Sequence, residues 1–179
     1  KTRPLEAKNN NFSDFMNVGK MFTNSVDITG SAAKMNYRAS ISNMQRSGVI
    51  PNNKLAKNNF SLRAGGEILP KLTLDMKVNY TWQKGQGRPE FSASGFNPIF
   101  SLIYTPRSIN LHEMKNVFDA DGNIIDWYPG LLTVVNNPYA ATSLTGSRDV
   151  TNRVNGFASL TYEILPWLKA MARFGGDTY

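Results

Sequence analysis

The chain has 179 residues but no cysteine, a single histidine and no run of 18 apolar residues. Without cysteine it has no disulfide, no thiolate nucleophile and no zinc–cysteine site. Without a long apolar run it has no transmembrane helix, which needs about 20 such residues. Membrane strands are not excluded, because they place their apolar residues in alternation, and the mean hydropathy of -0.35 is compatible with that pattern.

The sequence offers no catalytic constellation and no patch for nucleic acid. His112 is the only histidine, it has no cysteine to pair with, and no Gly-x-Ser-x-Gly elbow is present. The net charge is +7, with 20 Lys and Arg against 13 Asp and Glu. These charges alternate across several segments instead of forming one basic patch. We therefore expect no enzyme, no cofactor and no nucleic-acid partner.

Residues 119–123, with the sequence DADGN, are similar to the start of a calcium-binding loop. Position 12 of such a loop holds a glutamate, whereas this chain has Gly130 there. A β-hairpin accounts better for the residues, because Asp-Gly and Gly-Asn favour type I′ turns. We predict that turn at Asp121–Gly122 or Gly122–Asn123, and no metal site.

Six segments alternate apolar and polar residues with the period of a β-strand. The longest unbroken alternation runs from Leu72 to Trp82, with every second residue apolar. The predicted strands cover residues 24–31, 34–45, 57–68, 71–84, 150–164 and 167–177. Their polar sides carry both charge signs, at Asp27, Arg38, Arg63, Glu67, Asp75, Lys77, Arg153, Glu163, Lys169 and Arg173. Phe157 and Met171 interrupt the polar side.

The connections between these segments alternate in length. Residues 30–34, 68–72 and 164–168 are tight turns, whereas residues 46–56 and 85–149 form long links. Short turns at one end and long loops at the other are typical of outer-membrane barrels. In such a barrel the polar side faces the lumen and the apolar side faces lipid. The other reading is a soluble β-sandwich module that binds glycan, in which the apolar side is the core.

Strand length and aromatic placement favour the barrel. Tyr80 and Trp82 lie at one end of their segment, whereas Tyr37, Tyr162 and Trp167 lie near the short turns, as in two interfacial girdles. The predicted fold is all-β, an antiparallel meander of about six strands forming part of a large transmembrane β-barrel with one long extracellular loop. The segments are a lead-in at 1–23, strands at 24–84, the loop at 85–149 and strands at 150–179.

Several short motifs resemble the early barrel of SusC/RagA-type TonB-dependent outer-membrane transporters. They are NSVDITG at 24–30, YRAS at 37–40, GVIPN at 48–52, NNFSLR at 58–63, TPRSI at 105–109 and NPY at 137–139. Their order and spacing carry the resemblance, which covers roughly residues 12–177. It implies import of an oligomeric nutrient, glycan or peptide, across the outer membrane of a Gram-negative bacterium. It also implies energy supplied through TonB and a SusD-like surface lipoprotein as partner. An ungated porin leaves the motif order unexplained.

The chain also departs from that family. Such transporters have barrels of about 22 strands with a plugged lumen, whereas this sequence predicts about six strands, with no plug and no TonB box. An open sheet facing lipid would leave two unpaired edges. We therefore expect these residues to be a piece of a larger polypeptide.

Residues 85–149 are rich in aromatic side chains. One reading is a self-packed loop with a small core of its own. The other is a docking surface for the lipoprotein or the nutrient, since exposed Tyr and Trp suit both protein contact and sugar stacking. The candidate ligand or partner contacts are Phe96, Tyr104, Arg107, Trp127, Tyr128 and Tyr139.

Overall fold

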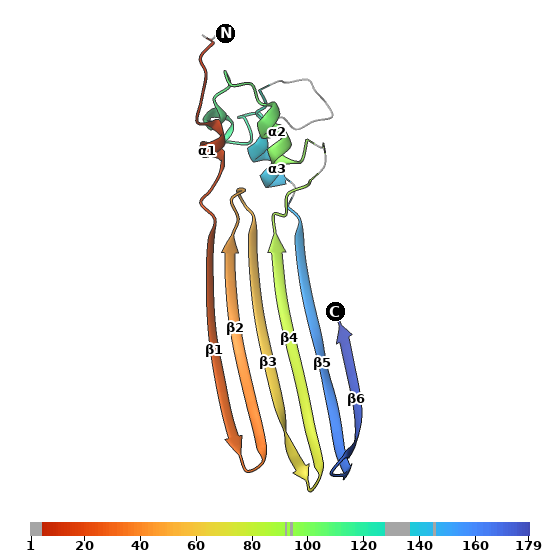
Figure 1. The fold of residues 1–179 in the computed structure, drawn as a ribbon. Coiled ribbons are helices and arrows are strands. Elements are labelled where there is room, and N and C mark those ends of the chain that lie inside the picture. Colours follow the sequence, from red (N-terminus) through yellow and green to blue (C-terminus); the bar gives the residue numbers. More distant parts are fainter. Residues whose placement is uncertain (1–4, 92, 94, 128–136, 145) are drawn as a thin grey trace. The chain divides into compact units, whose positions relative to one another are not determined.

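The computed structural model describes residues 5–91, 93, 95–127, 137–144 and 146–179. Its largest element is a six-stranded sheet in which the strands follow one another in sequence order (Figure 1). The strands are β1 Lys20–Ala32, β2 Met35–Ser47, β3 Lys54–Leu69, β4 Leu72–Gln86, β5 Arg148–Leu165 and β6 Leu168–Thr178. The predicted all-β antiparallel meander is confirmed.

Short helices make up the rest of the regular structure. They are α1 Asn11–Phe15, α2 Pro98–Tyr104, the 3-10 helix η1 Leu111–Met114 and α3 Pro138–Leu144. Asn97 caps α2 through its side-chain oxygen, which accepts hydrogen bonds from the amides of Ile99 and Phe100. Among the described residues, no helix combines the length and the apolar composition needed to cross a bilayer.

The strands are longer than the alternation alone predicts. β1 begins at Lys20 instead of at residue 24, and β5 runs for 18 residues. β6, the shortest, has 11 residues. A tilted strand crosses a bilayer with about 9–11 residues, so every strand of the sheet is long enough to do so.

Residues 68–72 and 164–168 share the pattern Ile-Leu-Pro-x-Leu, and a proline lies in the tight turn of each. Pro70 and Lys71 connect β3 to β4, and Lys71 has a positive φ of 68°. A positive φ after proline is the geometry of a type II turn. Pro166 and Trp167 connect β5 to β6, where a register irregularity between Glu163 and Leu165 precedes the turn. The two sequence patterns thus occupy equivalent hairpin positions.

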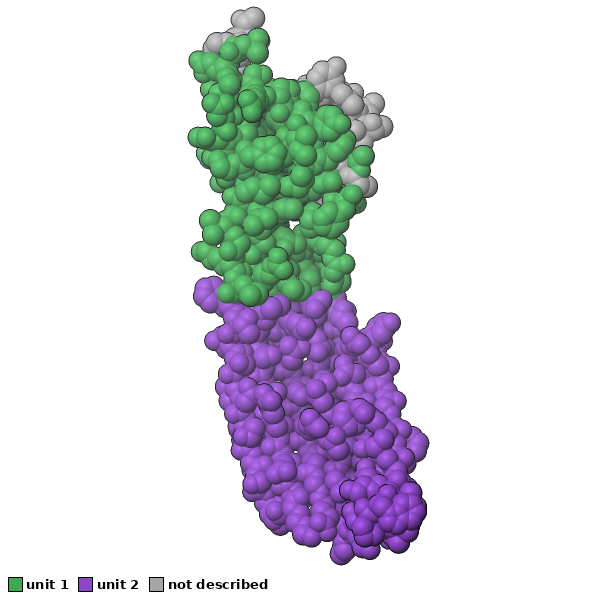
Figure 2. All heavy atoms as spheres, viewed as in Figure 1, with its two compact units in different colours: residues 1–21, 46–55, 85–149 green, residues 22–45, 56–84, 150–179 purple. Residues whose placement is uncertain are grey.

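The chain divides into two compact units (Figure 2). Unit 1 comprises residues 1–21, 46–55 and 85–149, and unit 2 comprises residues 22–45, 56–84 and 150–179. Unit 2 is sheet throughout. Unit 1 contains the helices and a buried cluster of five side chains, Phe15, Leu102, Leu111, Met114 and Tyr139.

The hairpin predicted at residues 119–123 is present, but its predicted turn type is wrong. Phe118 and Ile124 form an antiparallel bridge, and the Asp119 amide donates to the Asn123 carbonyl at 2.9 Å. A type I′ turn needs two residues with positive φ, and in this loop only Gly122 has one, at 83°. The Asp119 carboxylate accepts hydrogen bonds from the amides of Asp121 and Asn123, and these bonds favour the longer loop.

Candidate functional site

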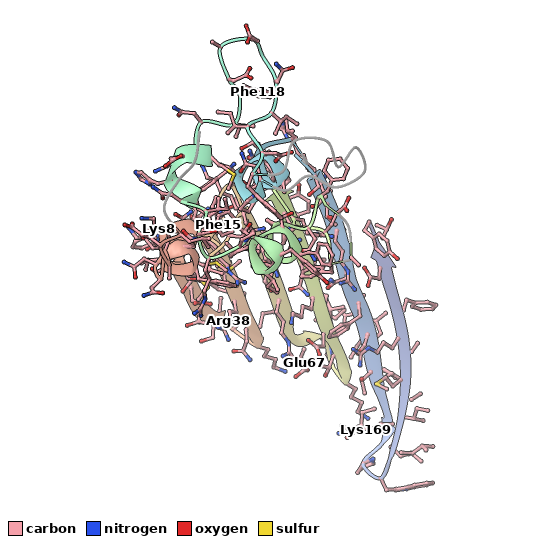
Figure 3. The ribbon with its side chains drawn as sticks, turned by 90° about the horizontal axis from the view of Figure 1, so that it is seen from above. Lys8, Phe15, Arg38, Glu67, Phe118 and Lys169 are labelled. Atoms are coloured by element: carbon pink, nitrogen blue, oxygen red, sulfur yellow. The ribbon has the colours of Figure 1, made fainter. Side chains whose placement is uncertain are left out.

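One side of the sheet carries a series of ion pairs that join neighbouring strands. We call this side the polar face. The pairs are Asp27–Arg38, Lys34–Glu67, Arg63–Asp75, Arg153–Asp177 and Glu163–Lys169. Figure 3 shows the labelled Arg38, Glu67 and Lys169 along the same side of the sheet. All ten side chains are partly or largely exposed to solvent, so each pair contributes little to stability.

Hydrogen bonds between polar side chains add to these links and also join β4 to β5, which the ion pairs named above do not join. Asn59 of β3 donates to Ser42 of β2 at 3.2 Å, and Thr81 of β4 donates to Asn59 at 2.9 Å. Asn79 of β4 donates to Asn155 of β5 at 2.8 Å. Together with the ion pairs, these bonds connect all six strands on one side, so the predicted separation of polar and apolar residues is realised.

The opposite side of the sheet, the apolar face, is broad and exposed. In β5 and β6 the register places Ala158 opposite Phe174 and Tyr162 opposite Ala170 on this side. Large side chains on it remain open, with Ile28 61% exposed and Phe174 77% exposed. Its exposed members include Phe22, Val26, Ile28, Tyr37, Ile41, Phe60, Leu62, Ile68, Val78, Tyr80, Val154, Leu160, Tyr162 and Phe174. Monomeric soluble proteins rarely expose so large a contiguous apolar area.

Phe157 and Met171, the two apolar residues that interrupt the polar face, have different surroundings. Phe157 is half-buried, and the guanidinium of Arg173 lies 3.8 Å from the centre of its ring. A cation over an aromatic face is stabilised by the ring's quadrupole. Met171 is exposed. Arg173 therefore covers one of the two apolar side chains with charge.

Unit 1 joins the predicted lead-in to the predicted long loop. The rings of Phe15 and Tyr139 meet edge to face with centres 5.1 Å apart. The Asn11 side chain donates to the Ile109 carbonyl at 2.8 Å, and the Lys8 amide donates to the Arg107 carbonyl at 2.7 Å. These contacts link segments about a hundred residues apart, so residues 8–15 belong to the folded unit.

A buried asparagine organises the centre of unit 1. Asn137 is fully buried, and its side-chain nitrogen donates to the carbonyls of Met114 and Ile125 at 2.9 and 2.8 Å. Its side-chain oxygen accepts from the amides of Tyr139 and Ala140 and so caps α3. One side chain thus joins three segments. This role is hard to foresee from the sequence, because an Asn-Pro dipeptide is an ordinary turn signal.

The candidate contact residues occupy different environments. Phe96 is 43% exposed and Tyr104 63% exposed, and Arg107 is also at the surface. Trp127 is half-buried and packs against the core cluster of unit 1. Tyr128 lies outside the described residues.

Tyr139, by contrast, is a core residue that is 8% exposed. Its hydroxyl donates to the Asp14 carbonyl at 3.3 Å. Burial, together with the negative charge of Asp14, raises the pKa of Tyr139. The structure gives this ring a packing role inside unit 1, as the self-packed reading of the loop expects.

Residues considered for chemistry are scattered. His112 lies in η1 at the surface, and no described neighbour forms a hydrogen bond with its ring. Within the described ranges, no three His, Asp or Glu side chains come close enough together to hold a metal ion. The polar and apolar faces are therefore the most distinctive functional feature of the chain.

Comparisons with known proteins agree with this architecture. No protein-family model matches the chain, and no curated protein matches it. A chain of the RagAB peptide importer, solved in its "closed-closed" state, is similar in structure, with a TM-score of 0.65 and 15% sequence identity. The match covers 93% of this chain and 18% of the importer chain. At that identity the likeness shows a shared fold, and this chain spans less than a fifth of the importer chain's length.

Proposed function

We propose that this chain is part of the barrel wall of a SusC/RagA-type TonB-dependent transporter in the outer membrane of a Gram-negative bacterium. The observation that carries the proposal is the contrast between the two faces of one sheet. The polar face is linked across all six strands by side-chain pairs, whereas the apolar face has nothing packed on it within unit 2. In a barrel these become the lumen wall and the lipid surface.

Exposure of the apolar face to water is energetically unfavourable. Burying a large aliphatic or aromatic side chain stabilises a protein by about 1.5–3 kcal/mol, and this face leaves many such side chains exposed. A soluble β-sandwich would cover them with a second sheet. All six described strands instead belong to one sheet. Contact with a lipid bilayer accounts for both the apolar composition of this face and the length of the strands.

The proposed cargo is an oligomeric nutrient, and the proposed partner is a SusD-like surface lipoprotein. The similar importer is described as a peptide importer, which favours peptide over glycan as the cargo. Energy would come through TonB, acting on parts of the transporter outside these residues. The chain itself would form part of the barrel wall and one extracellular loop, and it would carry out no catalysis.

Cysteine labelling tests the facing directly, because these residues contain no cysteine of their own. Leu160→Cys places a thiol on the apolar face, and Thr161→Cys places one on the polar face of the same strand. Both variants would be made in the complete protein and labelled in outer-membrane vesicles. The reagents are a charged, water-soluble maleimide and an apolar maleimide that partitions into lipid.

The expected result is that the charged reagent modifies Thr161→Cys and spares Leu160→Cys, while the apolar reagent modifies Leu160→Cys. Equal modification of both thiols by the charged reagent, in protein that is soluble without detergent, would establish the β-sandwich alternative. The two introduced thiols are one residue apart in the same strand, so their depth in the membrane and their local sequence are closely matched.

The lipoprotein partnership has its own test. Phe96 and Tyr104 are the candidate aromatic side chains that are exposed in the described part of unit 1, so replacing both by alanine should weaken co-purification of the lipoprotein. Tyr139→Phe is the control, because it keeps the buried ring and removes only the hydroxyl. Full retention of the lipoprotein by the double variant would exclude these two residues from the contact.

A further inference from the structure

The polar face of unit 2 contains a hollow lined by cations and hydroxyls. Its volume is about 290 Å³, and its lining side chains are Arg38 and Ser40 of β2, Ser61 and Arg63 of β3, and Lys77 of β4. All five belong to unit 2, and no acidic residue lines the hollow. We call it the β2–β4 hollow.

The two arginines keep hydrogen-bond donors available. Arg38 uses its Nε and Nη2 on Asp27, at 3.1 and 2.9 Å. Arg63 uses the same two atoms on Asp75, at 3.1 and 3.2 Å. The Nη1 group of each guanidinium makes no hydrogen bond to any described residue. Each carboxylate thus fixes one guanidinium through its Nε and Nη2 atoms and leaves the edge that carries Nη1 free to bind.

Of the three cations that line the hollow, Lys77 is the one whose charge no described carboxylate neutralises. It is half-buried, and no carboxylate among the described residues lies within ion-pair distance of its ammonium. The hydroxyls of Ser40 and Ser61 are likewise half-buried and make no hydrogen bond within the described part of the chain. The hollow therefore combines one uncompensated positive charge with donors from four other side chains.

We propose that the β2–β4 hollow is an anion site that binds a carboxylate group of the transported oligomer. A carboxylate offers two oxygens in a plane, and the free edge of a guanidinium matches that arrangement, while an ammonium contributes charge without directional demand. The volume admits one side-chain carboxylate and its hydration, not a whole oligomer. This inference rests on the proposed function, because only in a barrel does the polar face line the path of the cargo.

The test uses the complete protein, purified in detergent, and a fluorescent acetylated tetraglutamate as the probe. The uncharged control probe is acetylated tetraglutamine. Fluorescence anisotropy should show tighter binding of tetraglutamate, and salt should weaken that binding because exposed charges are screened. Lys77→Gln should weaken it about tenfold, since a hydrogen bond to a charged group is roughly twice as strong as a neutral one.

Two variants separate the hollow from general electrostatics. Lys77→Arg keeps the charge at the same place and should retain most of the affinity. Lys57→Gln removes one positive charge from the same side of β3 without touching the hollow, and should leave the affinity within about twofold, because a screened surface charge acts weakly at a distance.

The inference is overturned by equal affinity for the two probes, by absent tetraglutamate binding, or by equal losses in Lys77→Gln and Lys57→Gln. If an acidic segment of the same polypeptide already fills the hollow, no tetraglutamate binding will be observed. The cysteine-labelling result is independent of these outcomes. A confirmed lipid face with no tetraglutamate binding rejects only the anion site, whereas water-exposed Leu160→Cys rejects the barrel itself.

Discussion

Met76→Arg is the most informative single substitution for the proposed orientation of the sheet. Met76 lies on the apolar face of β4, and its neighbour Lys77 lies on the polar face. Arginine on the lipid face costs about 2–4 kcal/mol at the bilayer midplane and about 0–1 kcal/mol near the interfaces. The expected effect therefore depends on how deep Met76 lies.

That depth follows from the strand geometry. A strand rises about 3.4 Å per residue, and a tilt of about 45° leaves roughly 2.4 Å per residue along the membrane normal. The ten residue steps from Leu72 to Trp82 then span about 24 Å, close to the apolar band of about 25 Å found in outer-membrane barrels. Met76 lies about 10 Å from the Leu72 end, near the middle. We expect Met76→Arg to cost about 2–4 kcal/mol and Leu72→Arg to cost about 0–1 kcal/mol.

The assay is guanidinium unfolding of the complete protein in lipid vesicles, followed by tryptophan fluorescence and by heat-dependent gel mobility. Lys77→Arg is the matched control, since it introduces the same side chain one residue away on the other face, and it should be nearly neutral. If Met76→Arg and Lys77→Arg unfold at the same denaturant concentration, the apolar face does not contact lipid and the orientation is wrong.

Three further substitutions test local features. Gly66→Ala should destabilise the β2–β3 pairing by about 1–3 kcal/mol, because Gly66 has φ 152° and a Cβ there would lie 2.1 Å from the Lys34 carbonyl; Gly176→Ala, which meets nothing, should unfold like the unchanged protein. Asn137→Ala should lower the stability of unit 1 by roughly 3 kcal/mol in thermal unfolding, since two buried carbonyls lose their donor, and an unchanged midpoint would refute its organising role. Hydrogen bonds from the backbone, chiefly at Asn123, lower the pKa of Asp119, so its stabilisation of the hairpin holds above the unfolded pKa and is lost as pH falls through the folded pKa. The protection factor of the Asn123 amide, which is its exchange rate corrected for the intrinsic pH dependence of exchange, should therefore fall in acid, and Asp119→Asn, which keeps an acceptor oxygen, should abolish that fall.

The sheet was predictable because alternation is a local signal. Leu72 to Trp82 alone gives the period, the faces and an approximate length. The strand ends were less predictable: β1 extends back to Lys20 because pairing with β2 continues past the residues that alternate cleanly. The turn at residues 119–123 was mistaken because Asp-Gly favours type I′ by composition, whereas the Asp119 carboxylate bonds two amides of this particular loop.

Unit 1 was much less predictable, since its stability comes from contacts between segments far apart in sequence. Phe15 and Tyr139 are 124 positions apart, and neither lies in a periodic segment. Asn137 bonds to carbonyls in two other segments, a role that no sequence pattern encodes. For this reason the candidate list mixed exposed side chains such as Tyr104 with a core side chain, Tyr139. Aromatic content alone does not separate these two environments.

If the polar face lines the proposed cargo path, its ion pairs affect how selective that path can be. Exposed ion pairs contribute little to stability, but each one removes a cation and an anion from the set that the proposed cargo would meet. Arg153 and Lys169 are neutralised in this way by carboxylates on neighbouring strands, and Arg173 is held over the ring of Phe157. Lys77 remains uncompensated among the charges that face the centre of β4. If the wall selects cargo by charge, this pairing leaves Lys77 as an uncompensated charge in the β2–β4 hollow, although other cations of the polar face, such as Lys57, also lack an ion pair among the described residues.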